Sequence, residues 1–278
     1  MAQTKSQIQS ILAAANTAPR HRFGQNFMVD ANVVRLIADA GELSADDLVI
    51  EVGPGTGTLT EELLTRGPRV VAVEIDRDLS AMLREKFAGE PRFSLIEGDA
   101  LDGKHAVNAA LADTIRQQSR VKLVANLPYN IASPLVIELL MLGVERLVFT
   151  VQKEVADRLR AAPATNDFGP LTAMVQLLAD VEVMRTLPSS VFWPPPKIDS
   201  ALVRLKRNDR LGDEARGFSK FVSTLFSFRR KTLRKALSQA GVEIDPAVIA
   251  GRENARAEDF SPVELLTLYR ARKQASAE

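Results

Sequence analysis

A glycine-rich turn at residues 53–57 limits most strongly how this chain can fold. A short apolar run leads into glycines at positions 53, 55 and 57, and a helix-like segment follows. Glycine allows the backbone to turn sharply and to come close to a ligand. Seventeen residues beyond the last of these glycines, a second apolar run ends in Glu74, whose carboxylate can accept hydrogen bonds from two ribose hydroxyls. The pattern therefore predicts a nucleoside site that includes Gly53, Gly55 and Glu74.

The spacing of the glycines separates two classes of cofactor. A dinucleotide site carries G-x-G-x-x-G, and its pyrophosphate lies at a helix N-terminus. In this chain the pattern is G-x-G-x-G, which favours S-adenosylmethionine, because that cofactor has a ribose but no pyrophosphate. The alternative is a tight strand-to-helix turn that binds nothing, and the acidic end of the next strand favours the cofactor.

Apolar runs alternate with helix-like segments from residue 48 to residue 152. This alternation predicts an α/β fold, in which a mostly parallel sheet has helices on both faces. Two later β-rich runs, 181–187 and 199–206, are expected to pair antiparallel at the edge of the sheet, as in the Rossmann-like class I methyltransferases. The other expected strands are 48–52, 69–75, 93–97, 121–125 and 146–151, and the expected helices between them are 58–66, 78–87, 106–118 and 133–142.

The strand pattern stops near residue 207, and the rest of the chain looks helical. Ser261 followed by Pro262 is typical of a helix start, with proline at the first helical position. We therefore expect two domains, a methyltransferase-like domain over 1–207 and a small all-helical domain over 208–278. The helices expected after this boundary are 216–240, 244–250 and 261–273.

Positive charge gathers around this boundary. The net charge of the chain is only +1, but residues 204–235 contain eleven lysines or arginines and three acids. Such an asymmetry favours a polyanionic partner, and a solvated helix face is the alternative. Within this stretch Arg229, Arg230 and Lys231 could grip RNA phosphates.

The composition excludes several kinds of site. The 278 residues contain no cysteine, so disulfides, zinc–thiolate sites and cysteine nucleophiles are ruled out. With only two histidines, neither a histidine-based metal site nor a Ser-His-Asp triad is expected. No apolar run approaches the ~20 residues that a membrane span needs, and no secretory signal is recognisable. We expect a cytoplasmic monomer without a metal.

Two polar positions follow the third and fourth expected strands. Asp99 can accept a hydrogen bond from an adenine amino group, because ligands bind at the carboxyl ends of parallel strands. Its alternative role is that of a turn or helix N-cap residue. The string Asn126-Leu127-Pro128-Tyr129 ends the fourth strand.

This second string suggests the type of reaction. The exocyclic amine of a nucleobase is a poor nucleophile, because its lone pair is delocalised into the ring. The Asn126 side-chain oxygen and the backbone carbonyl that precedes Pro128 could hold its N–H groups and favour a pyramidal, nucleophilic geometry. No charged base is needed, and Tyr129 could stack on the base. The alternative is an Asx-type turn with a proline and a core tyrosine.

Two aromatic segments remain open to two interpretations. Residues 24–28, which include Asn26 and Met28, could close over the methionine end of the cofactor or form a loop with a buried Phe27. Phe192 and Trp193 lie in a proline-rich loop. One of them could present its ring to a flipped base, or both could pack in the core.

Taken in order, these segments resemble the ribosomal RNA adenine dimethyltransferase family over roughly residues 20–240. Small departures are Met28, where leucine is common, and the bulky Trp193. The matching segments are FGQNFM (23–28), EVGPGTGTLT (51–60), VEID (73–76), GDAL (98–101), NLPYNIASPL (126–135), VQKEVADRL (151–159), FGPLT (168–172), PPPKIDSALVRL (194–205) and LFSFRRKTLRKAL (225–237).

The resemblance implies N6,N6-dimethylation of two adjacent adenosines in the 3′-terminal hairpin of small-subunit (16S) ribosomal RNA, late in the biogenesis of that subunit. Relatives that methylate large-subunit RNA and confer antibiotic resistance, and a mainly non-catalytic assembly checkpoint factor, are the alternatives. The resemblance places the target adenine at Asn126, Leu127, Pro128 and Tyr129. It places the cofactor at Asn26, Met28, Gly53, Glu74, Asp99 and Asn126.

Overall fold

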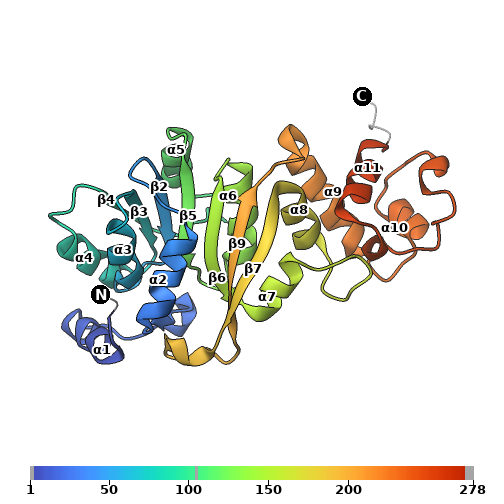
Figure 1. The fold of residues 1–278 in the computed structure, drawn as a ribbon. Helices are drawn as coiled ribbons and strands as arrows, with labels where there is room; N and C mark the ends of the chain where they lie inside the picture. Colours follow the sequence, from blue (N-terminus) through green and yellow to red (C-terminus); the bar gives the residue numbers. More distant parts are fainter. Residues whose placement is uncertain (1–2, 104–105, 273–278) are drawn as a thin grey trace. The chain divides into compact units, whose positions relative to one another are not determined.

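The computed structural model describes residues 3–103 and 106–272 (Figure 1). The chain forms two compact units. The first comprises the residues up to Ala156 together with Glu182–Arg207, and the second comprises Asp157–Val181 together with the residues from Asn208 onward. The boundary expected at residue 207 is therefore wrong for one segment. Residues 157–181 belong to the second unit because α8 (Pro170–Leu178) packs against the C-terminal helices α9 (Ala215–Ser227) and α11 (Pro262–Arg270).

A seven-stranded sheet forms the centre of the first unit, in the order β4-β3-β2-β5-β6-β9-β7. The first five strands in this order run parallel, and β9 runs antiparallel to β6. The α/β class and the antiparallel pair at the edge are thus confirmed. The strands are β2 (Leu48–Val52), β3 (Arg69–Glu74), β4 (Phe93–Glu97), β5 (Val121–Asn126), β6 (Arg146–Gln152), β7 (Ala179–Leu187) and β9 (Ser200–Arg207).

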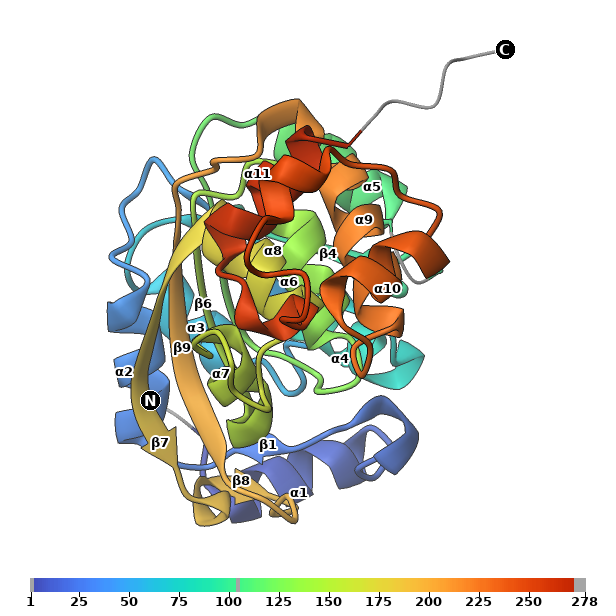
Figure 2. The same cartoon turned by 90° about the vertical axis from the view of Figure 1, so that its right-hand side faces the viewer.

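Helices cover both faces of this sheet, and α2 and α6 lie on opposite faces (Figures 1 and 2). Every residue of β2 is buried, as expected for a central parallel strand. Val34 and Ile37 of α2 pack with Val49 and Val148 in one apolar core. The helices of this unit include α2 (Ala31–Ala40), α3 (Thr58–Leu64), α4 (Arg77–Lys86), α5 (Ala109–Arg116) and α6 (Ala132–Met141), and α7 (Lys153–Leu159) follows β6.

The N-terminal segment packs against the carboxyl-end side of the sheet. Helix α1 (Lys5–Ala14) buries Ile8 and Leu12 against Phe27 and Leu79. Strand β1 (Phe27–Met28) pairs antiparallel with β8 (Phe192–Trp193), which follows the short helix η2 (Ser189–Val191). Two segments that are far apart in the sequence thus form a two-stranded sheet.

The second unit is helical and has its own aromatic core. Phe218 and Phe221 of α9 pack against Tyr269 of α11. The helix expected over 216–240 is interrupted, because the chain leaves α9 at Ser227 and starts α10 (Leu233–Gln239) only after Thr232 pairs with Arg256 in an isolated β-bridge. The expected start of α11 is confirmed, since the Ser261 hydroxyl accepts a hydrogen bond from the Glu264 backbone N–H.

Candidate active site

A cavity of about 240 Å³ opens at the carboxyl ends of the parallel strands. It brings together all the residues that the sequence suggested for a cofactor, from segments that span a hundred positions. No group of three or more histidine, acidic or cysteine side chains suited to a metal occurs among the described residues. The predicted cofactor residues that line the cavity are Asn26, Met28, Gly53, Gly55, Glu74, Asp99 and Asn126.

The glycine turn between β2 and α3 has the left-handed backbone that its sequence requires. The φ angles of Gly53, Gly55 and Gly57 are 73°, 60° and 77°, a region that residues with a Cβ rarely adopt. Space is restricted as well. A Cβ at position 53 would lie 3.3 Å from the Pro128 Cγ, and one at position 55 would lie 3.0 Å from the Phe27 ring. The turn therefore requires glycine at these positions, both for the positive φ angles and for the space that a Cβ would need.

Glu74 ends β3 with its side chain only 4% exposed. Its Oε1 accepts a hydrogen bond from the Asp76 backbone N–H at 2.9 Å, and its Oε2 accepts one from the Gly55 N–H at 3.3 Å. Burial nevertheless raises the pKa of Glu74 to about 7. Each oxygen keeps an acceptor position beside the cavity, so the residue can receive a pair of hydroxyl groups once it is ionised.

A second buried acid, Glu51, also lines the cavity, and the sequence analysis did not single it out. It is 1% exposed, and the hydroxyl of Thr60 donates a hydrogen bond of 2.6 Å to its Oε2. Burial raises the pKa of Glu51 to about 8, and the nearby charge of Glu74 adds to the shift. Glu51 therefore keeps its proton to a higher pH than an exposed carboxyl group does.

Asp99 lines the cavity as an exposed side chain. Its Oδ1 accepts a hydrogen bond from the Leu101 backbone N–H at 3.0 Å. The two readings of Asp99 from the sequence are thus compatible, because a turn residue can still offer its other carboxylate oxygen to a ligand.

The amide of Asn126 is held from two sides at the end of β5. Its Nδ2 donates a hydrogen bond to the backbone carbonyl of Asn26 at 2.8 Å, and its Oδ1 accepts one from the hydroxyl of Thr150. Pro128 packs against the glycine turn and lines the same cavity, while Leu127 is 2% exposed. The motif therefore adjoins this cavity.

Tyr129 lies beside this amide and is fixed by its hydroxyl group. Its Oη is 2.7 Å from the Oγ of Ser200, the first residue of β9, and Ser200 is fully buried. Burial raises the pKa of the Tyr129 phenol. Tyr129 is only partly buried, so its ring is neither a core residue nor freely mobile.

Phe192 does not present its ring to solvent, so the prediction that Phe192 itself contacts the RNA is wrong and, of the two aromatic residues, only Trp193 remains a candidate to face a flipped base. Phe192 is 2% exposed and packs in the main core with Met28 and Val191. The register of β8 explains the difference, because neighbouring residues of a strand point to opposite sides. Trp193 is the partly exposed member and stacks on Phe27, with ring centroids 6.4 Å apart.

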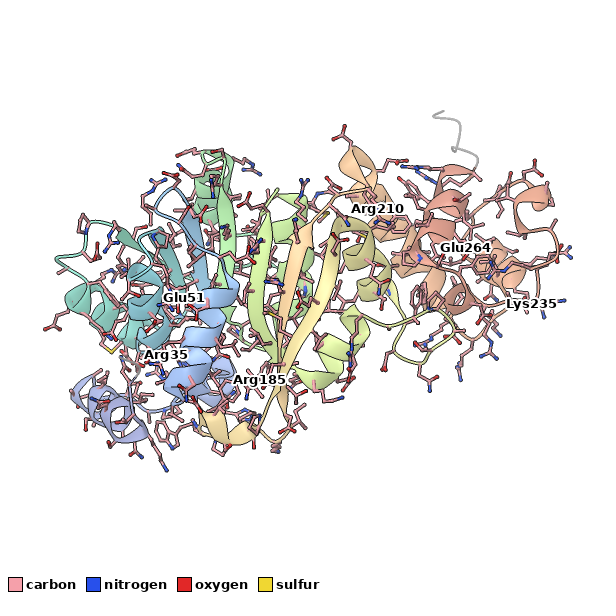
Figure 3. All side chains as sticks on the ribbon, in the orientation of Figure 1. Arg35, Glu51, Arg185, Arg210, Lys235 and Glu264 are labelled. Atoms are coloured by element: carbon pink, nitrogen blue, oxygen red, sulfur yellow. The ribbon has the colours of Figure 1, made fainter. Side chains whose placement is uncertain are left out.

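The three basic residues predicted to contact RNA also differ in their exposure. Arg229 forms an ion pair with Glu258 and donates a hydrogen bond of 2.8 Å to the Asn166 carbonyl, so its guanidinium group stabilises the unit. Arg230 and Lys231 are exposed. Lys231 lines a groove of the second unit together with Thr232, Arg234, Lys235, Ser238, Gln239, Glu253 and Asn254. Figure 3 shows Lys235 at the periphery of its unit.

Two further polar features beside the cavity were not foreseen from the sequence. Arg20 forms ion pairs with Asp76 and Asp78, and Gln25 donates a hydrogen bond of 2.9 Å to Asp76, so the segment that covers the cavity is fixed to the start of α4. Thr58 lines the cavity, and its buried hydroxyl has no hydrogen-bond partner in the protein. The unpaired hydroxyl of Thr58 and the glycine turn, which leaves no room for side chains, suit a polar ligand that binds close to the backbone.

This fold and this site define a Rossmann-like class I methyltransferase. The crystal structure of a dimethyladenosine transferase from Plasmodium falciparum has the same fold, with a TM-score of 0.69 at 21% identity over 88% of this chain and 99% of that chain. The crystal structure of the 23S rRNA methyltransferase ErmE matches with a TM-score of 0.62 at 27% identity, over the same shares of the two chains.

More narrowly, the chain belongs to the family described as ribosomal RNA adenine dimethylase, whose sequence model matches residues 16–270. A relative from Sulfurihydrogenibium sp. (strain YO3AOP1), named ribosomal RNA small subunit methyltransferase A, is 36% identical over 90% of this chain and 95% of its own length. The chain is thus a methyltransferase, and S-adenosylmethionine is its methyl donor. No helix among the described residues is long and apolar enough to span a membrane.

Proposed function

We propose that this enzyme dimethylates the N6 amines of two adjacent adenosines in the 3′-terminal hairpin of small-subunit ribosomal RNA, late in the assembly of the subunit. The relative from Sulfurihydrogenibium, named for the small subunit, supports this choice of RNA. The observation that carries the proposal is the position of Asn126, whose fixed carboxamide adjoins the cavity formed by the glycine turn and Glu74.

The cofactor residues have separate tasks in this proposal. Glu74 receives the two ribose hydroxyls, Asp99 receives the adenine amino group, and Gly53 and Gly55 allow the ligand to approach the backbone. Asn26 and Met28, together with Asn126, enclose the methionine end. The unpaired hydroxyl of Thr58 and the close contacts that any Cβ at positions 53 and 55 would make support a ligand of this kind.

The bound cofactor supplies an electrophilic methyl group on a sulfonium centre. The chain's own residues orient the acceptor: the Asn126 Oδ1 and the Leu127 backbone carbonyl accept the N–H groups of the target amine, and this favours the nucleophilic geometry of its nitrogen. Tyr129 contributes a ring face for the base, and its bond to Ser200 limits how that ring can turn. Pro128 fixes the backbone between them and packs against Gly53.

The second unit contributes the docking of RNA in this proposal. Arg230 and Lys231 are exposed, and Lys231, Arg234 and Lys235 place three basic side chains and Glu253 one acidic side chain along one groove. Such basic side chains bind phosphates without reading sequence. We further expect the enzyme to act as a cytoplasmic monomer on the small subunit or its precursor.

The experiment that tests the proposal is methylation in vitro of ribosomal subunits from a source that lacks this modification, with the modified nucleotides mapped afterwards. Methyl groups on two neighbouring adenosines near the 3′ end of small-subunit RNA are the expected result. Methylation of large-subunit RNA would identify a resistance-type enzyme instead. Tight subunit binding without any methyl transfer would identify a checkpoint factor.

A further inference from the structure

Thr150 lies directly opposite Asn126 in the parallel pair formed by β5 and β6. Its side chain is fully buried, and its hydroxyl donates to the Asn126 Oδ1. Thr150 is not among the residues that line the cavity. Any effect of its hydroxyl on the reaction has to pass through Asn126.

The orientation of the Asn126 amide follows from its two partners. The backbone carbonyl of Asn26 is only an acceptor, so the group that faces it at 2.8 Å is the NH₂ of Asn126. The oxygen then faces Thr150, whose hydroxyl serves as the donor. The torsion that turns a carboxamide is otherwise broad and roughly two-fold, and two hydrogen bonds of opposite polarity restrict it to one state.

We propose that Thr150 is a positioning residue for methyl transfer, which sets the direction of the acceptor that Asn126 offers to the target amine. This inference rests on the proposed role of Asn126. A carboxamide oxygen has two lone pairs. Thr150 occupies one of them, and the other remains for an N–H of the amine. Without the hydroxyl, the amide is held only through its nitrogen, and its oxygen can turn away from the productive direction.

The second methyl transfer depends more strongly than the first on the orientation of the Asn126 amide. The unmodified amine has two N–H groups for two acceptors, whereas the monomethyl product has one. A single remaining hydrogen bond orients the amine for the second transfer, so a poorly directed Asn126 slows that transfer more than the first. Loss of the Thr150 hydroxyl is therefore expected to allow monomethyladenosine to build up transiently.

Two matched pairs of variants isolate the hydroxyl. Wild type and Thr150→Val have nearly the same shape, and Thr150→Ser and Thr150→Ala share the same missing methyl group. Single-turnover rates on unmethylated small subunits should fall about tenfold in Thr150→Val, the change expected when the loss of about one hydrogen bond is felt in the transition state. Thr150→Ser should exceed Thr150→Ala by a similar factor. Thermal unfolding identifies variants that fail to fold, and the serine–alanine pair serves if valine is not tolerated.

A double-mutant cycle with Asn126→Ala decides whether Thr150 acts through Asn126. In the Asn126→Ala background, Thr150→Val should cause no further loss of rate. An equal loss in both backgrounds, or an unchanged rate and product ratio in Thr150→Val alone, would overturn the inference. Failure of the proposed function is distinguishable, since then wild type itself would leave these adenosines unmethylated.

Discussion

The Gly55 backbone N–H donates a hydrogen bond to the Glu74 carboxylate across 3.3 Å. The turn after β2 and the acid at the end of β3 thus meet at one point, although 19 positions separate them in the sequence. The Gly55 N–H orients the Oε2 of Glu74, and the Asp76 N–H orients its Oε1. Glu74 is therefore pre-organised before any ligand binds.

Removing this carboxylate should weaken the binding of S-adenosylmethionine. Glu74→Ala is expected to lose about 1.5–3 kcal/mol of binding free energy, the range for hydrogen bonds to a charged group. Isothermal titration calorimetry on the folded variant measures this directly. Unchanged affinity would remove Glu74 from the cofactor site.

Cofactor affinity should rise with pH around neutrality. Burial raises the pKa of Glu74 to about 7, so below that pH its protonated carboxyl has lost acceptor capacity for the ribose hydroxyls. Affinity at pH 6 should be about tenfold weaker than at pH 8, because one pH unit below the pKa about a tenth of the carboxyl is ionised. Binding near pH 6 should also release a proton, which calorimetry in buffers of different ionisation enthalpy detects.

Glu74→Gln is the matched control for this pH dependence, because it keeps the shape and cannot titrate. Its affinity should not vary over the same range. The change of S-adenosylmethionine affinity with pH should persist in Glu51→Gln. A wild-type affinity that is flat between pH 6 and pH 8 would contradict the assignment.

Glu51 should lower the stability of the ligand-free protein at high pH. Its pKa is raised from 4.5 to about 8 by burial, so the stabilising effect of its protonated form is complete below pH 4.5 and is lost as the pH rises through 8. Glu51→Gln should remove a slope of up to about 1.4 kcal/mol per pH unit in this window. Urea unfolding at pH 6 and pH 9 tests this, and parallel pH profiles of the two proteins would contradict it.

The exposed cations of the second unit should dominate the salt dependence of RNA binding. Arg230→Gln with Lys231→Gln should lower the slope of log affinity against log salt by about 0.7–0.9 for each lost phosphate contact. S-adenosylmethionine affinity should not change. Arg35→Gln with Arg116→Gln removes the same charge from exposed helix positions of the first unit and should leave the slope intact. Equal slopes in the two double variants would mean that RNA docks elsewhere.

Much of the sheet could be predicted from the sequence, because buried parallel strands appear as apolar runs and the acids and glycines mark their carboxyl ends. Strands β2 and β4 have the expected bounds. The interruption between α9 and α10 could not be foreseen. It depends on Thr232 pairing with Arg256, a contact that local helix propensity does not contain.

The predicted cofactor residues do line the cavity, but Glu51 and Thr58, which also line it, could not be foreseen from the sequence. The positions of Glu74 and Asn126 followed from the ends of strands. The raised pKa of Glu51 and the hydroxyl of Thr150 depend on burial and on strand register, and these arise only when the sheet forms. Arg229 likewise resembled a free cation, because Glu258, its partner, lies 29 positions further along the chain.

In the proposed reaction, the site transfers two methyl groups to one adenine nitrogen. The pocket must accept an amine that already carries a methyl group, and the apolar neighbours Leu127 and Pro128 suit this better than a further polar side chain would. Mass spectrometry of digested RNA from a completed reaction with excess cofactor measures the product. We predict N6,N6-dimethyladenosine, with the monomethyl form only transient. Monomethyladenosine as the sole final product would contradict it.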